Sequence, residues 1–234
     1  MPVLEELEAE MNRSLIVAAL AGVIAFAAGC KDKGGDGAMT TSEDRAPLLQ
    51  AAATAEETKP LKAGDRVPAA TVRDMDGQAE ELSALVATKP TVIIFYRGGW
   101  CPYCNTHLGA LATIEPRLVK LGYQVLAISA DRLGKVQETQ EKSDFRYRLL
   151  SDSKMEAARA FGIAFKVDDA TLEKYKGYGI DLEAASGETH HLLPVPSVFV
   201  VGTDGVIKFA YSNPNYKVRL EPEKVLAAAE RAAE

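Results

Sequence analysis

A pair of cysteines placed between a buried strand and a helix constrains this chain more than any other feature. Residues 91–96 form an unbroken apolar run rich in β-branched side chains, which is typical of a strand buried on both faces. Cys101 and Cys104 follow, and residues 105–121 then have helical composition. A second buried strand at 124–129 completes a βαβ pattern. The cysteines therefore fall at the carboxyl end of a strand, where open α/β sheets place their sites.

Two thiols at this spacing favour redox chemistry. Unpaired N–H groups and the positive end of the helix dipole lower the pKa of a thiol at a helix start. We therefore expect Cys101 to have the lower pKa and to attack, with Cys104 one turn later as its partner. Pro102 suits the first helical turn because it lacks an N–H. Trp100 is expected to pack beside the attacking sulfur and exclude water.

Three other uses of the pair were weighed. A structural zinc site usually needs four ligands, commonly two such pairs, and the chain has one pair. Haem attachment requires histidine directly after Cys104, where Asn105 stands. Inert structural cysteines are the remaining alternative to a redox-active dithiol.

The rest of the domain alternates between strands and helices. The further elements expected are strands at 147–150, 197–201 and 206–211, and helices at 133–142, 154–161 and from Pro222 onward. Pro116 should kink the helix at 105–121. Turn residues at 74–77 and 202–205 each join two extended segments, the second as a hairpin. The pattern predicts one α/β sandwich.

Net charge and cysteine count limit the kinds of partner and scaffold that this chain can have. The net charge of −6 gives no basic footprint for nucleic acid, so no nucleic-acid partner is expected. Three cysteines are too few for a disulfide scaffold in a chain of 234 residues. Cys30 lies far upstream of the other two and needs its own explanation.

The first thirty residues are typical of an export signal. From Met11 there is a short basic start, an apolar run at 15–28 and small residues before Cys30. The four glutamates in residues 1–10 have the wrong charge for the leading end of such a signal, so natural translation is expected to start at Met11. Residues 31–60 are rich in small and charged residues and predict a flexible tether, with the folded domain at 61–234.

The residues that end at Cys30 resemble the bacterial lipobox, in which the cysteine receives lipid. This resemblance implies a lipoprotein of the cell envelope, anchored to a membrane with its domain in the periplasm or outside the cell. The alternative is an ordinary export signal that ends near a cysteine.

From about residue 61 the chain resembles the peroxiredoxin-like branch of the alkyl hydroperoxide reductase and thiol-specific antioxidant (redoxin) family, within the thioredoxin-like superfamily. Four segments carry the resemblance: Phe95-Tyr96-Arg97-Gly98-Gly99-Trp100-Cys101-Pro102-Tyr103-Cys104, Ala127-Ile128-Ser129-Ala130-Asp131, Leu150-Ser151-Asp152 and Leu193-Pro194-Val195-Pro196. It implies a thioredoxin-like α/β fold: a central mixed sheet flanked by helices, an N-terminal hairpin, and a long insertion before a strand that opens at a cis proline, Pro196.

The resemblance also implies an antioxidant thiol peroxidase. Cys101 would be oxidised by a hydroperoxide to sulfenic acid, Cys104 would resolve it to a redox-active disulfide, and a thioredoxin-like protein would reduce the disulfide. No cofactor and no metal are implied. The sequence departs from the family at Gly98, where a threonine or serine is usual, and at Val195-Pro196, where an arginine is usual just ahead of the late strand. Arg97 is expected to replace part of that charge.

Two alternatives remain open. The C-x-x-C pair and the cis-proline position resemble thiol–disulfide oxidoreductases, which implies a membrane-tethered enzyme acting on protein disulfides. The cysteine pair together with a histidine, either His190 or His191, resembles the site of copper-binding carriers of the superfamily, which have three residues between their cysteines. For the histidines, including His107, a solvent-facing position is the simpler expectation.

The segment 165–191 is longer than a plain helix-to-strand connection, so we expect it to form a lid over the dithiol. Its expected apolar anchors are Tyr175, Tyr178, Ile180 and Leu182. The alternative is a packed surface loop with no access to the cysteines.

Overall fold

The computed structural model describes residues 50–233. The expected export signal, Cys30 and residues 31–49 of the expected tether lie outside the described residues. Among the described helices, none has the length and apolar content needed to cross a membrane.

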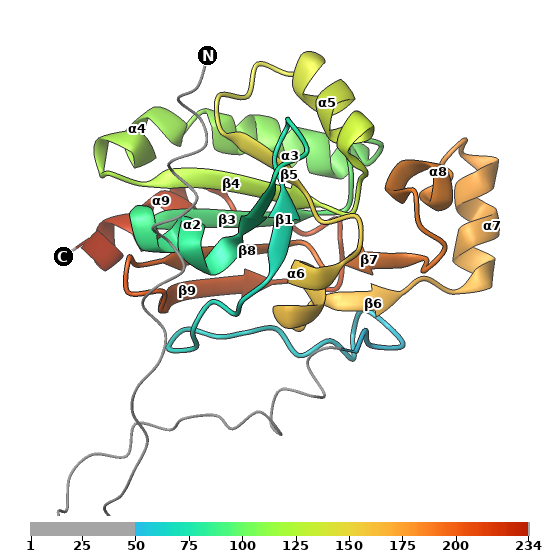
Figure 1. Ribbon diagram of the computed structural model, residues 1–234, viewed down its shortest axis with the longest axis horizontal. Helices are drawn as coiled ribbons and strands as arrows, with labels where there is room; N and C mark the ends of the chain where they lie inside the picture. The colour runs from blue at the N-terminus through green and yellow to red at the C-terminus, as the bar shows by residue number, and fades with distance from the viewer. Residues whose placement is uncertain (1–49, 234) are drawn as a thin grey trace, which may run out of the picture. The chain divides into compact units, whose positions relative to one another are not determined.

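A central sheet organises the described part of the chain (Figure 1). Its seven strands, in spatial order, are β2 (Ala79–Glu81), β1 (Thr71–Arg73), β5 (Arg148–Ser151), β4 (Gln124–Ser129), β3 (Thr91–Tyr96), β8 (Ser197–Val201) and β9 (Ile207–Ser212). The strands β3, β4 and β5 are parallel, whereas β8 is antiparallel to β3. Both short hairpins, β1–β2 and β8–β9, are antiparallel. The expected mixed sheet with an N-terminal hairpin is confirmed.

Helices cover both faces of this sheet, as the two-sided burial of β3 requires. One face packs against α3 (Pro102–Ala112), α4 (Glu115–Lys120), α5 (Leu133–Glu141) and α9 (Pro222–Ala233). The other packs against α2 (Leu82–Thr88), α6 (Glu156–Ala160) and the strand pair β6 (Ala164–Lys166) and β7 (Leu192–Pro194). Along β3, Val92 and Ile94 serve the first face while Ile93 and Phe95 serve the second.

The helix expected at 105–121 is two helices. The first, α3, ends at Ala112, and α4 begins at Glu115. Pro116 lies in the first turn of α4, where its missing N–H has no helical partner to lose. The proline therefore divides the segment rather than kinking one helix.

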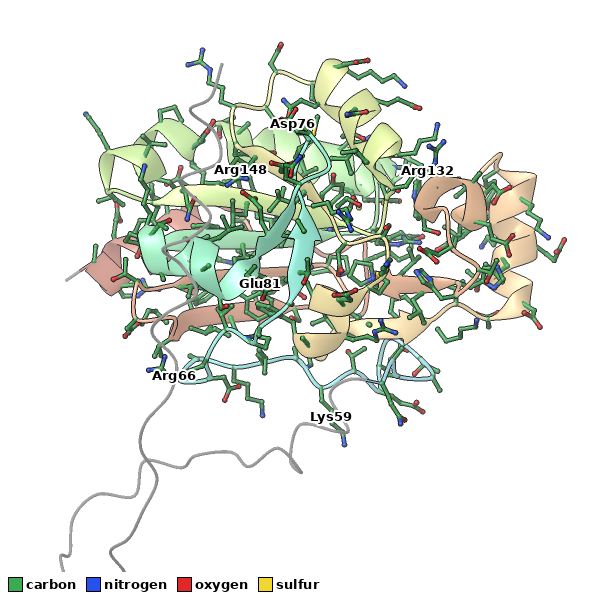
Figure 2. The ribbon with its side chains drawn as sticks, in the orientation of Figure 1. Lys59, Arg66, Asp76, Glu81, Arg132 and Arg148 are labelled. Atoms are coloured by element: carbon green, nitrogen blue, oxygen red, sulfur yellow. The ribbon has the colours of Figure 1, made fainter. Side chains whose placement is uncertain are left out.

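The insertion at 165–191 is structured and attached to the end of β4. It contains α7 (Asp169–Gly177) and α8 (Leu182–Ser186), each capped by an aspartate side chain. Arg132, which lies beside α8 (Figure 2), donates its backbone N–H to Ala185 O at 2.8 Å and its Nε–H to Ala184 O at 3.0 Å. Of the expected anchors, Tyr178 is wrong, because its side chain is 67% exposed.

The fold begins earlier than the expected boundary at residue 61. Ala52 donates its N–H to Ala164 O and accepts from Lys166 N–H, both at 2.9 Å, which adds a bridge along β6. Lys59, at the lower edge of Figure 2, donates its N–H to Gly162 O at 3.0 Å. Residues 50–60 are therefore part of the folded domain and not of a tether.

The expected cis bond at Pro196 is wrong: no peptide bond in residues 50–233 is cis. Only two residues separate β7 from β8, and backbone hydrogen bonds hold the chain on both sides of the proline. Val195 N–H donates to Ile163 O at 2.8 Å, and Pro196 O accepts from Asn213 N–H at 3.3 Å. The trans bond satisfies both contacts and is the lower-energy form by about 0.5–1 kcal/mol.

Candidate active site

The two cysteines meet at the start of α3. Cys101 is the N-cap residue and Cys104 lies in the first turn, with its N–H donating to Cys101 O at 3.0 Å. Both are free thiols, and both are buried, at 2% and 0% exposure. Their side chains are hydrogen-bonded to each other. The structure thus brings together the pair that the sequence singled out, in a geometry suited to a reversible disulfide.

The loop before Cys101 has two positions where only glycine fits. At Gly98, φ is +153°, and a Cβ would lie 2.3 Å from Trp100 Nε1 and 2.6 Å from Asp131 Oδ1. A Cβ at Gly99 would lie 1.9 Å from Thr139 Oγ1. The indole and the carboxylate occupy the space that a side chain at position 98 would need.

Arg97 lies on one side of the dithiol inside an aromatic cage. The side chain is 3% exposed, and its Cζ lies 4.2 Å from the ring centroid of Tyr216, 5.1 Å from Trp100 and 5.3 Å from Tyr175. Its Nη2 donates to the Tyr175 hydroxyl. Tyr175 belongs to α7, so the insertion reaches the active-site loop, as the lid hypothesis requires.

Arg219 contacts the second cysteine, and the sequence analysis missed it. Its Nη2 donates to Cys104 Sγ at 3.3 Å, while its Nε and Nη1 are buried without a hydrogen-bond partner. The residue comes from the connection between β9 and α9, where no motif or periodicity marks it. Only the fold, which places this connection against α3, reveals the contact.

The hydrogen bond between the two thiols is the largest effect that separates their pKa values, and the Arg219 charge adds to it. Burial alone would raise the pKa of Cys104, but the hydrogen bond from Cys101, the Arg219 charge and the Arg97 backbone N–H together lower it to about 6. The pKa of Cys101 is raised, first by its hydrogen bond to Cys104 and then by burial. The lower pKa was expected at Cys101, and which of the two thiols attacks the substrate stays a prediction. Both thiols lie at the helix start, so the dipole does not separate them. The Arg219 charge lowers the pKa of Cys104, and the Arg97 charge lowers that of Cys101.

Asp131, at the end of β4, supports the same loop. Its carboxyl is 1% exposed, and Oδ2 accepts from Gly99 N–H at 2.7 Å while Oδ1 has no partner. Burial raises the pKa of Asp131 to about 7, against the lowering effect of the Gly99 hydrogen bond. Beside it, a cavity of about 430 Å³ extends from Trp100 to α5 and Ile180 of the insertion.

The histidines do not join the cysteines in a metal site. His107 is 8% exposed, contrary to expectation, and donates from Nε2 to Leu220 O at 2.9 Å. His190 Nε2 lies 2.7 Å from Ser153 O, and His191 Nε2 lies 2.7 Å from Glu183 Oε1. Within residues 50–233, no cluster of three or more histidine, cysteine or acidic side chains is placed to hold a metal ion. The copper-carrier alternative therefore gains no support.

Comparison with known proteins agrees with this architecture. Residues 63–210 match the AhpC/TSA family. Peroxiredoxin Bcp of Escherichia coli K12 is 32% identical over 104 residues, which span 44% of this chain and 66% of that protein. Chloroplastic peroxiredoxin Q of Suaeda salsa is 26% identical over 178 residues, or 76% of this chain and 70% of that protein.

Solved structures show the same fold at lower identity. Peroxidoxin BcpB of Mycobacterium tuberculosis superposes with a TM-score of 0.58 at 22% identity, covering 73% of this chain and 97% of that one. Reduced Prx3 of Vibrio vulnificus, in complex with hydrogen peroxide, gives 0.59 at 16% identity, covering 72% and 99%. The family match spans the sheet, the cysteine pair and the insertion, and the chain therefore belongs to the AhpC/TSA family.

Proposed function

We propose that this protein is a thiol peroxidase that reduces hydroperoxides with the Cys101–Cys104 dithiol. The observation that carries the proposal is a pair of buried, hydrogen-bonded thiols at the start of a helix, on a member of this family. The Vibrio vulnificus protein of similar fold binds hydrogen peroxide, and a Xanthomonas campestris one reduces alkyl peroxides. We extend this substrate class to the present chain.

The chemistry needs only the two cysteines and an external dithiol. A thiolate attacks one peroxide oxygen, the O–O bond breaks, and the other oxygen leaves as water or alcohol. The resulting sulfenic acid is attacked by the second sulfur, which forms the disulfide and releases water. A thioredoxin-like dithiol then reduces the disulfide by exchange.

A thiol–disulfide oxidoreductase is the second candidate, favoured by Gly98 and Val195-Pro196 standing where the resemblance implies peroxide-binding side chains. Both candidates need a protein to reach cysteines that are 2% and 0% exposed, so burial does not separate them. The membership of the AhpC/TSA family favours the peroxidase.

The decisive experiment is peroxide turnover coupled to a thioredoxin system, with insulin disulfide reduction measured on the same sample. We expect the wild type to consume hydrogen peroxide or an organic hydroperoxide, and Cys101→Ser and Cys104→Ser each to lose coupled turnover. Arg117→Met, an exposed position on α4, should keep it. Rapid insulin reduction without peroxide turnover would instead identify a disulfide reductase.

We further propose that the chain is exported and carries lipid on Cys30, which would place the enzyme on a membrane of the bacterial cell envelope. The support is the sequence pattern that ends at Cys30. Radiolabelled palmitate incorporation should disappear in Cys30→Ser. Persistent labelling and membrane association in that variant would contradict the anchor.

A further inference from the structure

We infer that His190 is a pH-sensitive latch at the neck of the insertion, which it holds closed beside the active-site loop when neutral and releases when protonated. The neck is the strand pair β6 and β7, through which the chain enters and leaves α7 and α8 (Figure 1). The inference goes beyond the peroxidase function and does not depend on the identity of the substrate.

The neck has few backbone hydrogen bonds at its open end. The strands β6 and β7 pair over three residues each, and the last pair is Lys166 opposite Leu192. Beyond that pair, Val167 N–H donates to His191 O at 2.9 Å, and Lys166 Nζ donates to His190 O at 2.6 Å. His191 has a φ of +54°, a left-handed conformation that is uncommon outside glycine. The return of the chain into β7 therefore combines few bonds with a strained residue.

The two side-chain hydrogen bonds of His190 require its neutral form. Nδ1 accepts from Leu192 N–H at 2.9 Å, so Nδ1 carries no proton. Nε2 lies 2.7 Å from Ser153 O, which can only accept, so Nε2 carries the proton. A protonated imidazole has an N–H on both nitrogens, and its Nδ1–H would face the Leu192 N–H, donor against donor. Protonation therefore breaks the contact at the first residue of β7.

The surroundings of His190 keep it neutral at pH 7. Burial lowers the pKa of His190 from its ordinary value of 6.5; the Ser153 carbonyl and the Glu188 charge raise this pKa, while the charges of Arg159 in α6 and Lys166 in β6 lower it. The folded chain thus takes up this proton at a lower pH than the unfolded chain does. The stabilising effect of neutral His190 on the neck is therefore complete above pH 6.5 and is lost as the pH falls below it.

A small cavity connects the latch to the active site. Its lining includes His190 together with Arg97, Trp100 and Asp131, and the two charged groups of these three belong to the active-site loop and the end of β4. Trp100 and Arg97 also contact the ring of Tyr175 in α7. Opening of the neck should therefore loosen α7 and the wall of this cavity, and so expose Trp100, the only tryptophan of the chain.

The first test measures amide hydrogen exchange of Leu192 by NMR at pH 7.5 and pH 5.0, as protection relative to an unstructured chain. We expect the protection of Leu192 to fall by about tenfold at pH 5.0, while that of Ile94 in the buried strand β3 is kept. His190→Asn offers an acceptor near the position of Nδ1 and does not titrate, so its Leu192 protection should change by less than about twofold. No fall in the wild type, an equal fall in His190→Asn, or an equal fall at Ile94 would overturn the latch.

His191→Gln is the matched control for the first test. His191 is the neighbouring titratable residue, and its Nε2 lies 2.7 Å from Glu183 Oε1, a contact that protonation strengthens rather than breaks. This variant should therefore keep the pH response of Leu192. If His191→Gln abolishes the response and His190→Asn retains it, the switch belongs to the wrong histidine and the inference fails.

The second test asks whether the neck controls access to the dithiol, at pH 7.5 throughout so that thiol ionisation stays constant. His190→Ala removes both side-chain hydrogen bonds and should mimic the open neck. We expect labelling of Cys101 by iodoacetamide and quenching of Trp100 fluorescence by acrylamide each to increase by about threefold or more, with His191→Gln close to the wild type. Wild-type values in a folded His190→Ala that has lost Leu192 protection would refute this control.

Both tests are independent of the proposed function. Hydrogen exchange, iodoacetamide labelling and acrylamide quenching need no peroxide, so they report on the neck even if the protein turns over no hydroperoxide. The pH test on the wild type also needs no substitution, so it decides the inference if His190→Ala does not fold.

Discussion

Two arginines lie near the dithiol, Arg97 buried and Arg219 half-buried, and they contact different groups. Arg97 lies in the active-site loop and is surrounded by three aromatic rings that come from the loop, the insertion and the segment after β9. Arg219 lies far away in sequence and contacts a sulfur directly. Adjacency to the motif therefore does not decide which arginine tunes a thiol. What decides it is the group that each guanidinium faces.

The comparison assigns Arg97 a mainly structural task. Its guanidinium joins Trp100, Tyr175 and Tyr216, which belong to three separate segments, and so it closes the site around Cys101. Each cation–π contact of a desolvated arginine contributes about 0.5–2 kcal/mol. Among the described residues, Arg219 makes no such set of aromatic contacts. Its guanidinium donates to the Cys104 sulfur instead.

Among these variants, we expect Arg97→Met to have the largest effect on stability. Loss of the cage contacts should lower the free energy of unfolding by about 3 kcal/mol, measured by urea denaturation. The pH profile of Cys104 labelling should stay close to the wild-type profile, because the Arg97 backbone N–H and the Arg219 contact both remain. A profile shifted as far as that of Arg219→Met would show that the two arginines act alike.

Gly98→Ala should have the next largest effect. The new Cβ would collide with the Trp100 indole and Asp131, and the backbone would keep a positive φ that alanine disfavours. We expect a loss of about 2 kcal/mol in unfolding free energy and a marked fall in peroxide turnover.

Gly109→Ala is the matched control for that change. Gly109 lies within α3, and its Cβ would meet nothing within 4 Å. This variant should gain up to about 1 kcal/mol from helix propensity. Equal losses in both variants would mean that the crowding at Gly98 has no special weight.

The sheet could be predicted from sequence far better than the site. Residues 91–96 and 125–129 are recognisable as strands because both faces are buried and nearly every position is apolar or small. The cysteine pair is equally visible, because the chemistry of two close thiols needs neighbouring positions in one helical turn. These signals are local in the sequence, so they can be recognised without any knowledge of the fold.

Arg219 and Tyr175 could not be found in the same way. Their roles depend on where the connection at 213–221 and the helix α7 pack, which is decided by contacts between distant segments. His107 gives the same lesson, since a lone histidine on a helix carries no mark of burial. The helix-dipole argument for Cys101 is limited for a related reason: it weighed a local effect that both cysteines share and could not include the Arg219 charge, which lies far away in sequence.

Tyr175→Leu should open the Cys101 side with a smaller effect on stability. The variant loses the contact with Arg97 and the packing on Trp100, where the ring centroids lie 5.8 Å apart. We expect a loss of about 1–2 kcal/mol and faster labelling of Cys101 by iodoacetamide. Tyr178→Leu, at a side chain that is 67% exposed, should stay within about 0.5 kcal/mol of the wild type. If both variants label at the wild-type rate, α7 is a surface element rather than a lid.

His107→Gln should have the smallest effect, and it appears only in the pH dependence of stability. Burial lowers the pKa of His107 to about 4, against an ordinary value of 6.5. Below pH 6.5 the unfolded chain takes up a proton that the folded chain refuses until about pH 4, so the wild type loses stability as the pH falls through this window.

At pH 5.5 the lowered pKa of His107 should reduce the free energy of unfolding of the wild type by about 1 kcal/mol. Glutamine can still donate to the Leu220 carbonyl but does not titrate. Burial raises the pKa values of Asp131 and Asp152 to about 7, so these two groups change the stability with pH in the opposite direction to His107. Their effect is the same in the wild type and in His107→Gln, and it cancels when the two proteins are compared. Urea denaturation at pH 7 and pH 5.5 should therefore show a steeper decline for the wild type than for His107→Gln. Parallel declines would mean that His107 is protonated in the folded protein. Its hydrogen bond to Leu220 would then have to persist with the positive charges of His107 and Arg219 close together.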